Sequence, residues 1–165
     1  FLLVEGFLHT KSFRRYLLRM LLFALVSEVP FDFAMGGKLL DWTQQNMLFT
    51  LVVGLIMLYG MKTFSASRVV QVLIAIAAVF WCVLMKTQFG LCMILLAAVY
   101  YLLRDQKAKL WVGGVISLMY VTGPVSVFLL KRYNGQLGDR PNKYLFYCQY
   151  PLSLLILGVI TYVIA

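Results

Sequence analysis

The stretches VVQVLIAIAAVFWCVLM at residues 69–85 and FGLCMILLAAVYYLL at residues 89–103 decide the fold class. Gln71 is the only strongly polar side chain in the first stretch, and three residues, Lys86 to Gln88, separate the two. Apolar runs of this length broken by a short polar turn are typical of a tight pair of apolar helices. This pair predicts a helical protein whose surface faces lipid.

The composition of the whole chain points the same way. Of its 165 residues, 62% are hydrophobic and 13% are charged, whereas soluble domains are about 45–50% apolar and about 25% charged. A water-soluble fold of this size could not hide so much apolar surface, so the natural solvent is lipid. We therefore expect an all-α, polytopic transmembrane helix bundle.

Apolar runs and polar breaks predict the positions of the helices. Several runs are shorter than the roughly 20 residues that cross a bilayer upright, so about six to seven transmembrane or re-entrant helices are expected. One of them should stop near Pro30. No repeat or linker divides residues 1–165, which predicts a single membrane domain. Phe1 lies inside an apolar run, which predicts that an upstream helix is missing. The expected helices cover residues 1–8, 16–29, 47–61, 69–85, 89–103, 110–130 and 144–165.

The basic residues lie in short loops between the apolar runs. The formal charge is +9, and in this setting it indicates contact with anionic headgroups rather than with nucleic acid. The loops at 11–19, 62–68 and 104–109 hold more Lys and Arg than the alternate loops, so we place them on the cytoplasmic side. Cys82, Cys92 and Cys148 stand singly, which favours neither a disulfide framework nor a metal site.

Glu5 and His9 form the first candidate site. Residues four apart share one face of a helix, so the carboxylate can orient the imidazole and raise its basicity. Such an imidazole can remove a proton from a hydroxyl or an amine before acyl transfer. The alternative is a polar helix end at the membrane interface.

Four cations follow His9 within nine positions: Lys11, Arg14, Arg15 and Arg19. Such a cluster attracts phosphate, either of lipid headgroups or of a nucleotide-containing donor such as acetyl-CoA. Anchoring of the helix by the positive-inside rule is the alternative. Neither a Walker motif nor GxGxxG occurs in the chain.

Further polar residues form candidate contacts for a substrate. Glu28 and Asp32 flank Pro30, and acidic groups beside hydrocarbon usually face a cavity or a cation. Gln45 and Asn46 form a polar entrance to the next helix, which helix capping explains in part. Asn134 lies in a loop with a turn signal and with excess basic charge on the expected non-cytoplasmic side. Because this charge runs against the positive-inside rule, it indicates either an anion contact or a different topology.

These residues together resemble the TraX family of membrane proteins. Two of the similar stretches, FLLVEGFLHT and the SEVPFD within 16–33, are far more specific than general hydrophobicity. The similar segments are FLLVEGFLHT (1–10), YLLRMLLFALVSEVPFDF (16–33), QNMLFT (45–50), RYNGQLG (132–138) and KYLFYCQYPLSLLIL (143–157).

The resemblance implies a multi-helix protein of the bacterial inner membrane, and the family's founding activity is acetylation of the N-terminal amine of a conjugative pilin. It also implies roles for the polar residues that match the family pattern: Glu5 and His9 in catalysis, and Arg14, Glu28, Asp32, Gln45, Asn46 and Asn134 at the substrate. The charge of the basic cluster, rather than the resemblance, assigns Lys11, Arg15 and Arg19 to the donor's phosphates. Two positions depart from the family pattern. Ser153 stands where a histidine is expected, and Gln88 stands where an acidic residue is expected.

The leading hypothesis is a membrane acetyltransferase that uses acetyl-CoA and no metal. Its acceptor would be an amine or a hydroxyl, on a peptide or a glycan, and nucleic acid is not an expected partner. The second hypothesis is a non-catalytic membrane subunit that recruits a protein partner, which the two departures favour. A transporter is less favoured, since almost all charges lie at helix ends.

Overall fold

The computed structural model describes residues 1–36, 43–103, 106–117 and 143–164, and this part of the chain is helical. The predicted all-α class is therefore confirmed. None of the helices in these ranges combines the length and the apolar character required to cross a membrane. In chain order the helices are α1 (Leu2–His9), α2 (Phe13–Gly36), α3 (Met47–Thr63), α4 (Arg68–Leu84), α5 (Gly90–Leu102), α6 (Gln106–Ser117) and α8 (Lys143–Ile164).

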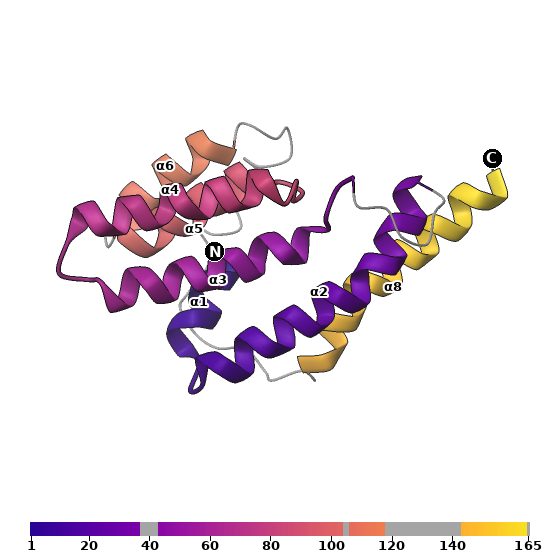
Figure 1. Ribbon diagram of the computed structural model, residues 1–165, viewed down its shortest axis with the longest axis horizontal. Coiled ribbons are helices and arrows are strands. Elements are labelled where there is room, and N and C mark those ends of the chain that lie inside the picture. The colour runs from indigo at the N-terminus through magenta and orange to yellow at the C-terminus, as the bar shows by residue number, and fades with distance from the viewer. Residues whose placement is uncertain (37–42, 104–105, 118–142, 165) are drawn as a thin grey trace.

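Helix α3 is the centre of the arrangement (Figure 1). It packs against α1, α2, α4 and α5, while α6 packs against α5 and α8 packs against α2. Apolar residues occur on all sides of α3, as expected for a helix with several neighbours. The polar residue within the apolar stretch 69–85, Gln71, is buried where α3 meets α4, and its Nε2 donates to the Met61 carbonyl at 3.0 Å.

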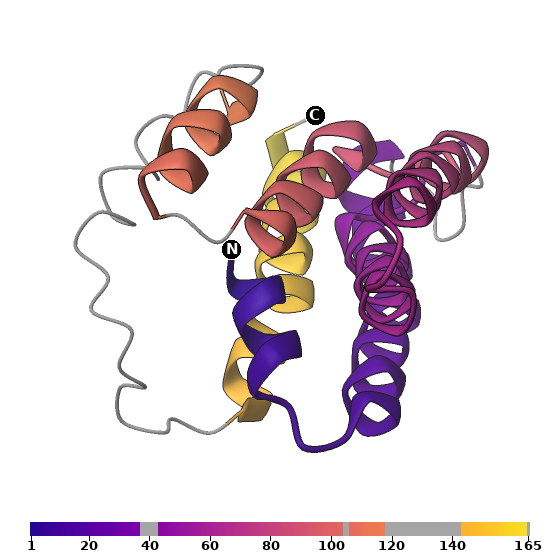
Figure 2. The same ribbon diagram turned by 90° about the vertical axis from the view of Figure 1, so that its left-hand side faces the viewer.

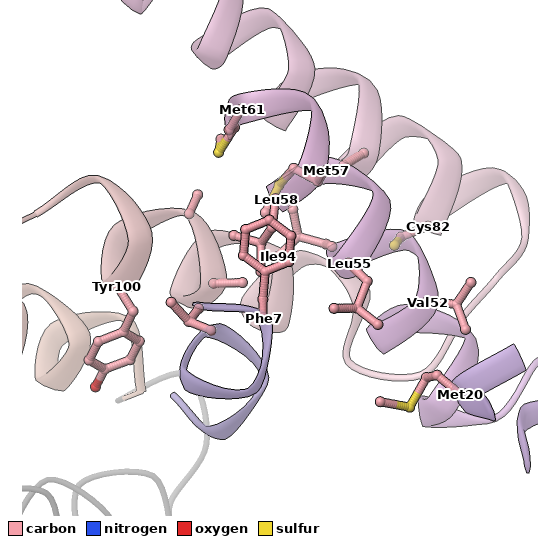
Figure 3. Close-up of a cluster of buried hydrophobic side chains, with 14 of the residues drawn as sticks. Phe7, Met20, Val52, Leu55, Met57, Leu58, Met61, Cys82, Ile94 and Tyr100 are labelled. Atoms are coloured by element: carbon pink, nitrogen blue, oxygen red, sulfur yellow. The ribbon is translucent and has the colours of Figure 1, made fainter. Parts of the chain in front are cut away.

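The core forms around the middle of α3 (Figure 3). Leu55, Leu58 and Met61 of α3 are fully buried, and Phe7 of α1 and Ile94 of α5 close over them. Full burial of one such side chain stabilises a fold by about 1.5–3 kcal/mol. The side chains of α3 therefore hold α1 and α5 in place.

Helices α2 and α8 lie side by side along much of their length (Figures 1 and 2). Gly158 of α8 permits the close approach, because a Cβ there would lie 2.5 Å from Cδ1 of Phe33 and 3.4 Å from Cα of Ala34. Small residues at a helix interface let two backbones come this close. Residues from the two ends of the sequence thus form one unit.

The expected end of a helix near Pro30 is wrong. Helix α2 continues through Pro30 to Gly36. Proline removes one backbone hydrogen bond from a helix, but Pro30, Phe31 and Asp32 are all buried in this case. Packing of this part of α2 outweighs the lost hydrogen bond.

The other expected helices are present, with modest shifts at their ends. Helix α3 extends two residues beyond the predicted 47–61, and α6 begins at Gln106 rather than at residue 110. Residues 118–142, which include the rest of the expected helix 110–130 and most of the long basic loop, lie outside the described residues.

Replacing Gly158 with alanine should destabilise the protein. Alanine favours a helix by up to about 1 kcal/mol over glycine, but the added Cβ meets the Phe33 ring and the α2 backbone. Overpacking of this kind costs about 1–3 kcal/mol. We expect a lower midpoint in thermal unfolding of the detergent-purified protein, followed by circular dichroism.

Gly60→Ala is the matched control. A Cβ at this position of α3 would lie 3.4 Å from the Ile74 side chain, an ordinary contact, so the helical preference of alanine decides the outcome. Stability should stay equal or rise. A Gly158→Ala protein as stable as Gly60→Ala would contradict the close packing of α2 on α8.

Candidate functional site

Helix α1 brings Glu5 and His9 together as the sequence predicts. His9 Nδ1 lies 2.9 Å from the Glu5 carbonyl oxygen and 3.5 Å from Glu5 Oε2. The His9 side chain is 63% exposed, whereas that of Glu5 is 28% exposed. A neutral imidazole that donates from Nδ1 to Glu5 keeps its lone pair on Nε2. This tautomer presents Nε2 as a base to any group that approaches from outside.

A pocket opens at the same end of the bundle, where α1, the start of α2 and the last turn of α3 meet. Its volume is about 460 Å³, within the usual range for ligand pockets. Two residues that directly follow His9 contribute to its wall, although Glu5 and His9 themselves do not. The pocket is lined by Phe7, Thr10, Lys11, Phe13, Tyr59, Lys62 and Thr63.

Lys62 is a member of this pocket that the sequence reading did not select. Its Nζ lies 5.7 Å from the centre of the Phe7 ring, a cation–π contact. The signal that could have found it is the count of basic loops, which placed Lys62 on the same side as Lys11. The structure confirms this relation, because both lysines line one pocket.

The three arginines of the basic cluster do not join the pocket wall. Arg14 and Arg15 are exposed at the start of α2. Arg19 turns back along its own helix, where its Nε donates to the Arg15 carbonyl at 3.1 Å. Of the predicted donor-phosphate residues, only Lys11 reaches the pocket.

A second polar cluster lies where α3 begins. Asn46, fully buried, caps α3 by accepting from the Leu48 backbone N–H at 2.9 Å. Its Nδ2 donates to the Ala24 carbonyl at 2.8 Å and to Glu28 Oε2. The predicted Glu28 and Asn46 are therefore in direct contact, and both polar atoms of the Asn46 side chain have protein partners.

Not every polar atom of this cluster is satisfied. Glu28 Oε1 and Ser27 Oγ are buried and have no hydrogen-bond partner among the described residues. Asp32, one turn after Glu28, is 3% exposed. Leaving a buried oxygen such as Glu28 Oε1 or Ser27 Oγ without a partner costs about 1–3 kcal/mol, so these two atoms reduce the stability that packing gives to this part of α2.

The predicted residues thus form two sites rather than one. Phe13 lines the pocket, and Glu28 lies fifteen residues further along the same helix. At 1.5 Å per residue this corresponds to about 22 Å. Because α2 is continuous, Glu28, Asp32 and Asn46 cannot contact a small group held at His9. Asn134 lies outside the described residues.

The comparison with protein families covers both sites. The family model with the description "TraX protein" matches residues 1–137. The chain belongs to the TraX family. No curated protein and no solved structure matches it.

Two other polar positions of this TraX-family chain, Gln45 and Thr50, connect helices to one another. The Gln45 backbone carbonyl accepts from the Gln88 backbone N–H at 3.0 Å, and Thr50 Oγ1 donates to the Gln88 carbonyl at 2.8 Å. These bonds tie the start of α3 to the turn between α4 and α5. Ser153 Oγ donates to the Tyr150 carbonyl of its own helix at 2.8 Å.

Asn46→Ala should destabilise the fold by about 2–4 kcal/mol. It removes the cap of α3 and leaves the Glu28 carboxylate without its amide donor. Thermal unfolding of the purified protein would show this as a large fall in the midpoint. Gln44→Ala, which alters an exposed residue two positions earlier, is the control and should change little. Similar midpoints for the two variants would rule out Asn46 as an anchor of α3.

Proposed function

We propose that this TraX-family chain is a membrane acetyltransferase that moves an acetyl group from acetyl-CoA to an amine or hydroxyl acceptor. The observation that carries the proposal is the Glu5–His9 pair, with Nδ1 engaged and the imidazole exposed beside a pocket lined by two lysines. Family membership supports the reaction class. The bacterial inner membrane is the proposed location.

In the proposed reaction His9 Nε2 takes a proton from the acceptor as the acceptor's nitrogen or oxygen attacks the acetyl carbonyl. The new N–C or O–C bond forms and the thioester C–S bond breaks. The proton on Nε2 then passes to the departing thiolate, which leaves as the thiol. Glu5 stabilises the imidazolium between these steps, and a positioned base of this kind typically contributes about 10²–10⁴-fold to the rate.

Exposed apolar side chains support the membrane setting. On α4 the large side chains of Leu73, Ile76, Phe80 and Leu84 are each more than half exposed and recur at helical spacing. Monomeric soluble proteins rarely show a continuous apolar stripe of this kind. Hydrocarbon of a bilayer is the solvent that suits it.

A non-catalytic membrane subunit is the second candidate. Two departures from the family pattern, Ser153 and Gln88, favour it. The Ser153 hydroxyl donates to a carbonyl of its own helix, and at Gln88 it is the backbone that holds the α4–α5 turn. Copurification from native membranes separates the two functions. A stoichiometric partner together with no acetyl transfer would favour the subunit.

His9→Ala should lower the release of coenzyme A thiol from acetyl-CoA by about 10²–10⁴-fold in native membranes, which supply the acceptor. Glu5→Gln should cause a smaller loss, because the Glu5 carbonyl still holds Nδ1. Gln149→Ala, at an exposed position of α8, should keep full turnover. Undiminished turnover after His9→Ala would remove this histidine from the reaction.

A further inference from the structure

The pocket between α1, α2 and α3 concentrates positive charge without an acid to balance it. Lys11 and Lys62 both contribute to its wall, and none of its lining residues is acidic. Lysine at the end of a helix is usually explained by the partial negative charge of the last carbonyls. Lys62 fits that explanation, since it lies in the last turn of α3. Lys11 follows the C-cap of α1, Thr10, and also lies two residues before α2, whose first turn carries partial positive charge.

The start of α2 adds to the same positive field. Tyr16 N–H donates to the Ser12 carbonyl, so the backbone N–H groups before it have no acceptor within the helix. No acidic residue occupies the first turn of α2. The N-terminus of this 24-residue helix, which carries partial positive charge, therefore lies at the pocket, since its first residue, Phe13, is part of the wall.

Aromatic rings form the apolar part of the wall. Phe13 and Tyr59 stack with ring centroids 4.3 Å apart and an interplanar angle of 15°. Phe7 lies under the Lys62 ammonium. Thr10 and Thr63 also lie in the wall, where the Thr63 hydroxyl donates to the Tyr59 carbonyl of its own helix at 2.9 Å. The pocket thus offers two ammonium groups beside flat apolar surface. This combination suits an anion that is joined to an apolar or ring-bearing group.

We infer that Lys11 and Lys62 form a binding site for a phosphate ester. Two mobile ammonium groups match the charge of phosphate, and a hydrogen bond to an ionised acceptor is roughly twice as strong as a neutral one. The phosphate could belong to a nucleotide-containing donor or to an anionic lipid headgroup. For the donor, the inference rests on the proposed function; the phosphate site itself does not.

Binding to the full-length protein in nanodiscs tests the site. In phosphatidylcholine nanodiscs, titration calorimetry would compare coenzyme A with pantetheine, which lacks the phosphates. In a second arm, native mass spectrometry would count phosphatidylglycerol molecules retained by the protein. The variants are Lys11→Ala, Lys62→Ala and the conservative Lys62→Arg. The control is Lys86→Ala. Lys86 is an exposed lysine in the turn between α4 and α5, which bonds to Gln45 just before the start of α3, far from the pocket.

Each alanine variant should weaken coenzyme A binding by about tenfold or more, while Lys62→Arg retains most of it. Pantetheine binding and the Lys86→Ala protein should be unaffected. If only phosphatidylglycerol retention responds, the site holds a lipid phosphate and the donor binds elsewhere. The inference is overturned if neither ligand responds to the lysine variants, or if Lys86→Ala has an equal effect, in protein that circular dichroism shows to be folded.

The same assay separates this inference from the proposed reaction. His9→Ala should bind coenzyme A normally and lose turnover, because His9 lies outside the pocket wall. Lys62-dependent binding without any turnover would support the phosphate site and contradict the acetyltransferase. Acetyl transfer in lysine variants whose coenzyme A binding is unchanged would support the acetyltransferase and contradict the phosphate site.

Discussion

The buried start of α3 is the constraint on which the rest of the structure depends. A helix that begins inside a protein has backbone N–H groups that need acceptors. Asn46 meets this need for α3 and also joins it to α2 through Ala24 and Glu28. The backbone of Gln45 forms hydrogen bonds with the turn between α4 and α5. Tyr150 of α8 bonds to the Met47 backbone. The core side chains of α3 then meet their neighbours in one register.

The two ends of α3 carry different chemistry as a result. Lys62 follows Asn46 by sixteen residues, which is about 24 Å along the helix. Amide and carboxylate groups cross-link helices at one end, and exposed cations with aromatic rings surround a pocket at the other. The acetyl transfer proposed at His9 belongs to the second end, since α1 ends beside that pocket.

Contacts between residues close in the sequence, and the side of the bundle on which a loop lies, could be predicted from local sequence patterns. Spacing of four residues placed Glu5 against His9, and alternation of basic loops placed Lys62 on the side of Lys11. The course of α2 through Pro30 could not be predicted, because burial of the flanking residues outweighs the rule for proline. The partners of Asn46 could not be predicted either, because Ala24 and Glu28 belong to another helix. Capping of α3 accounts for only one of its bonds, which is why the sequence favours a substrate contact for this residue.

The degree to which each polar site is satisfied decides which end of α3 can accept a ligand. Asn46 has protein partners for both its amide oxygen and its amide nitrogen, so it has little left to offer. Glu28 Oε1 has no partner among the described residues, but it exposes almost no surface, and a ligand could reach it only if the helices separated. Lys11 and Lys62 are exposed and repel each other across a pocket with no acid in its wall. An anion there would lower the free energy of the folded state without moving a helix, which is the physical reason for placing the ligand at that end.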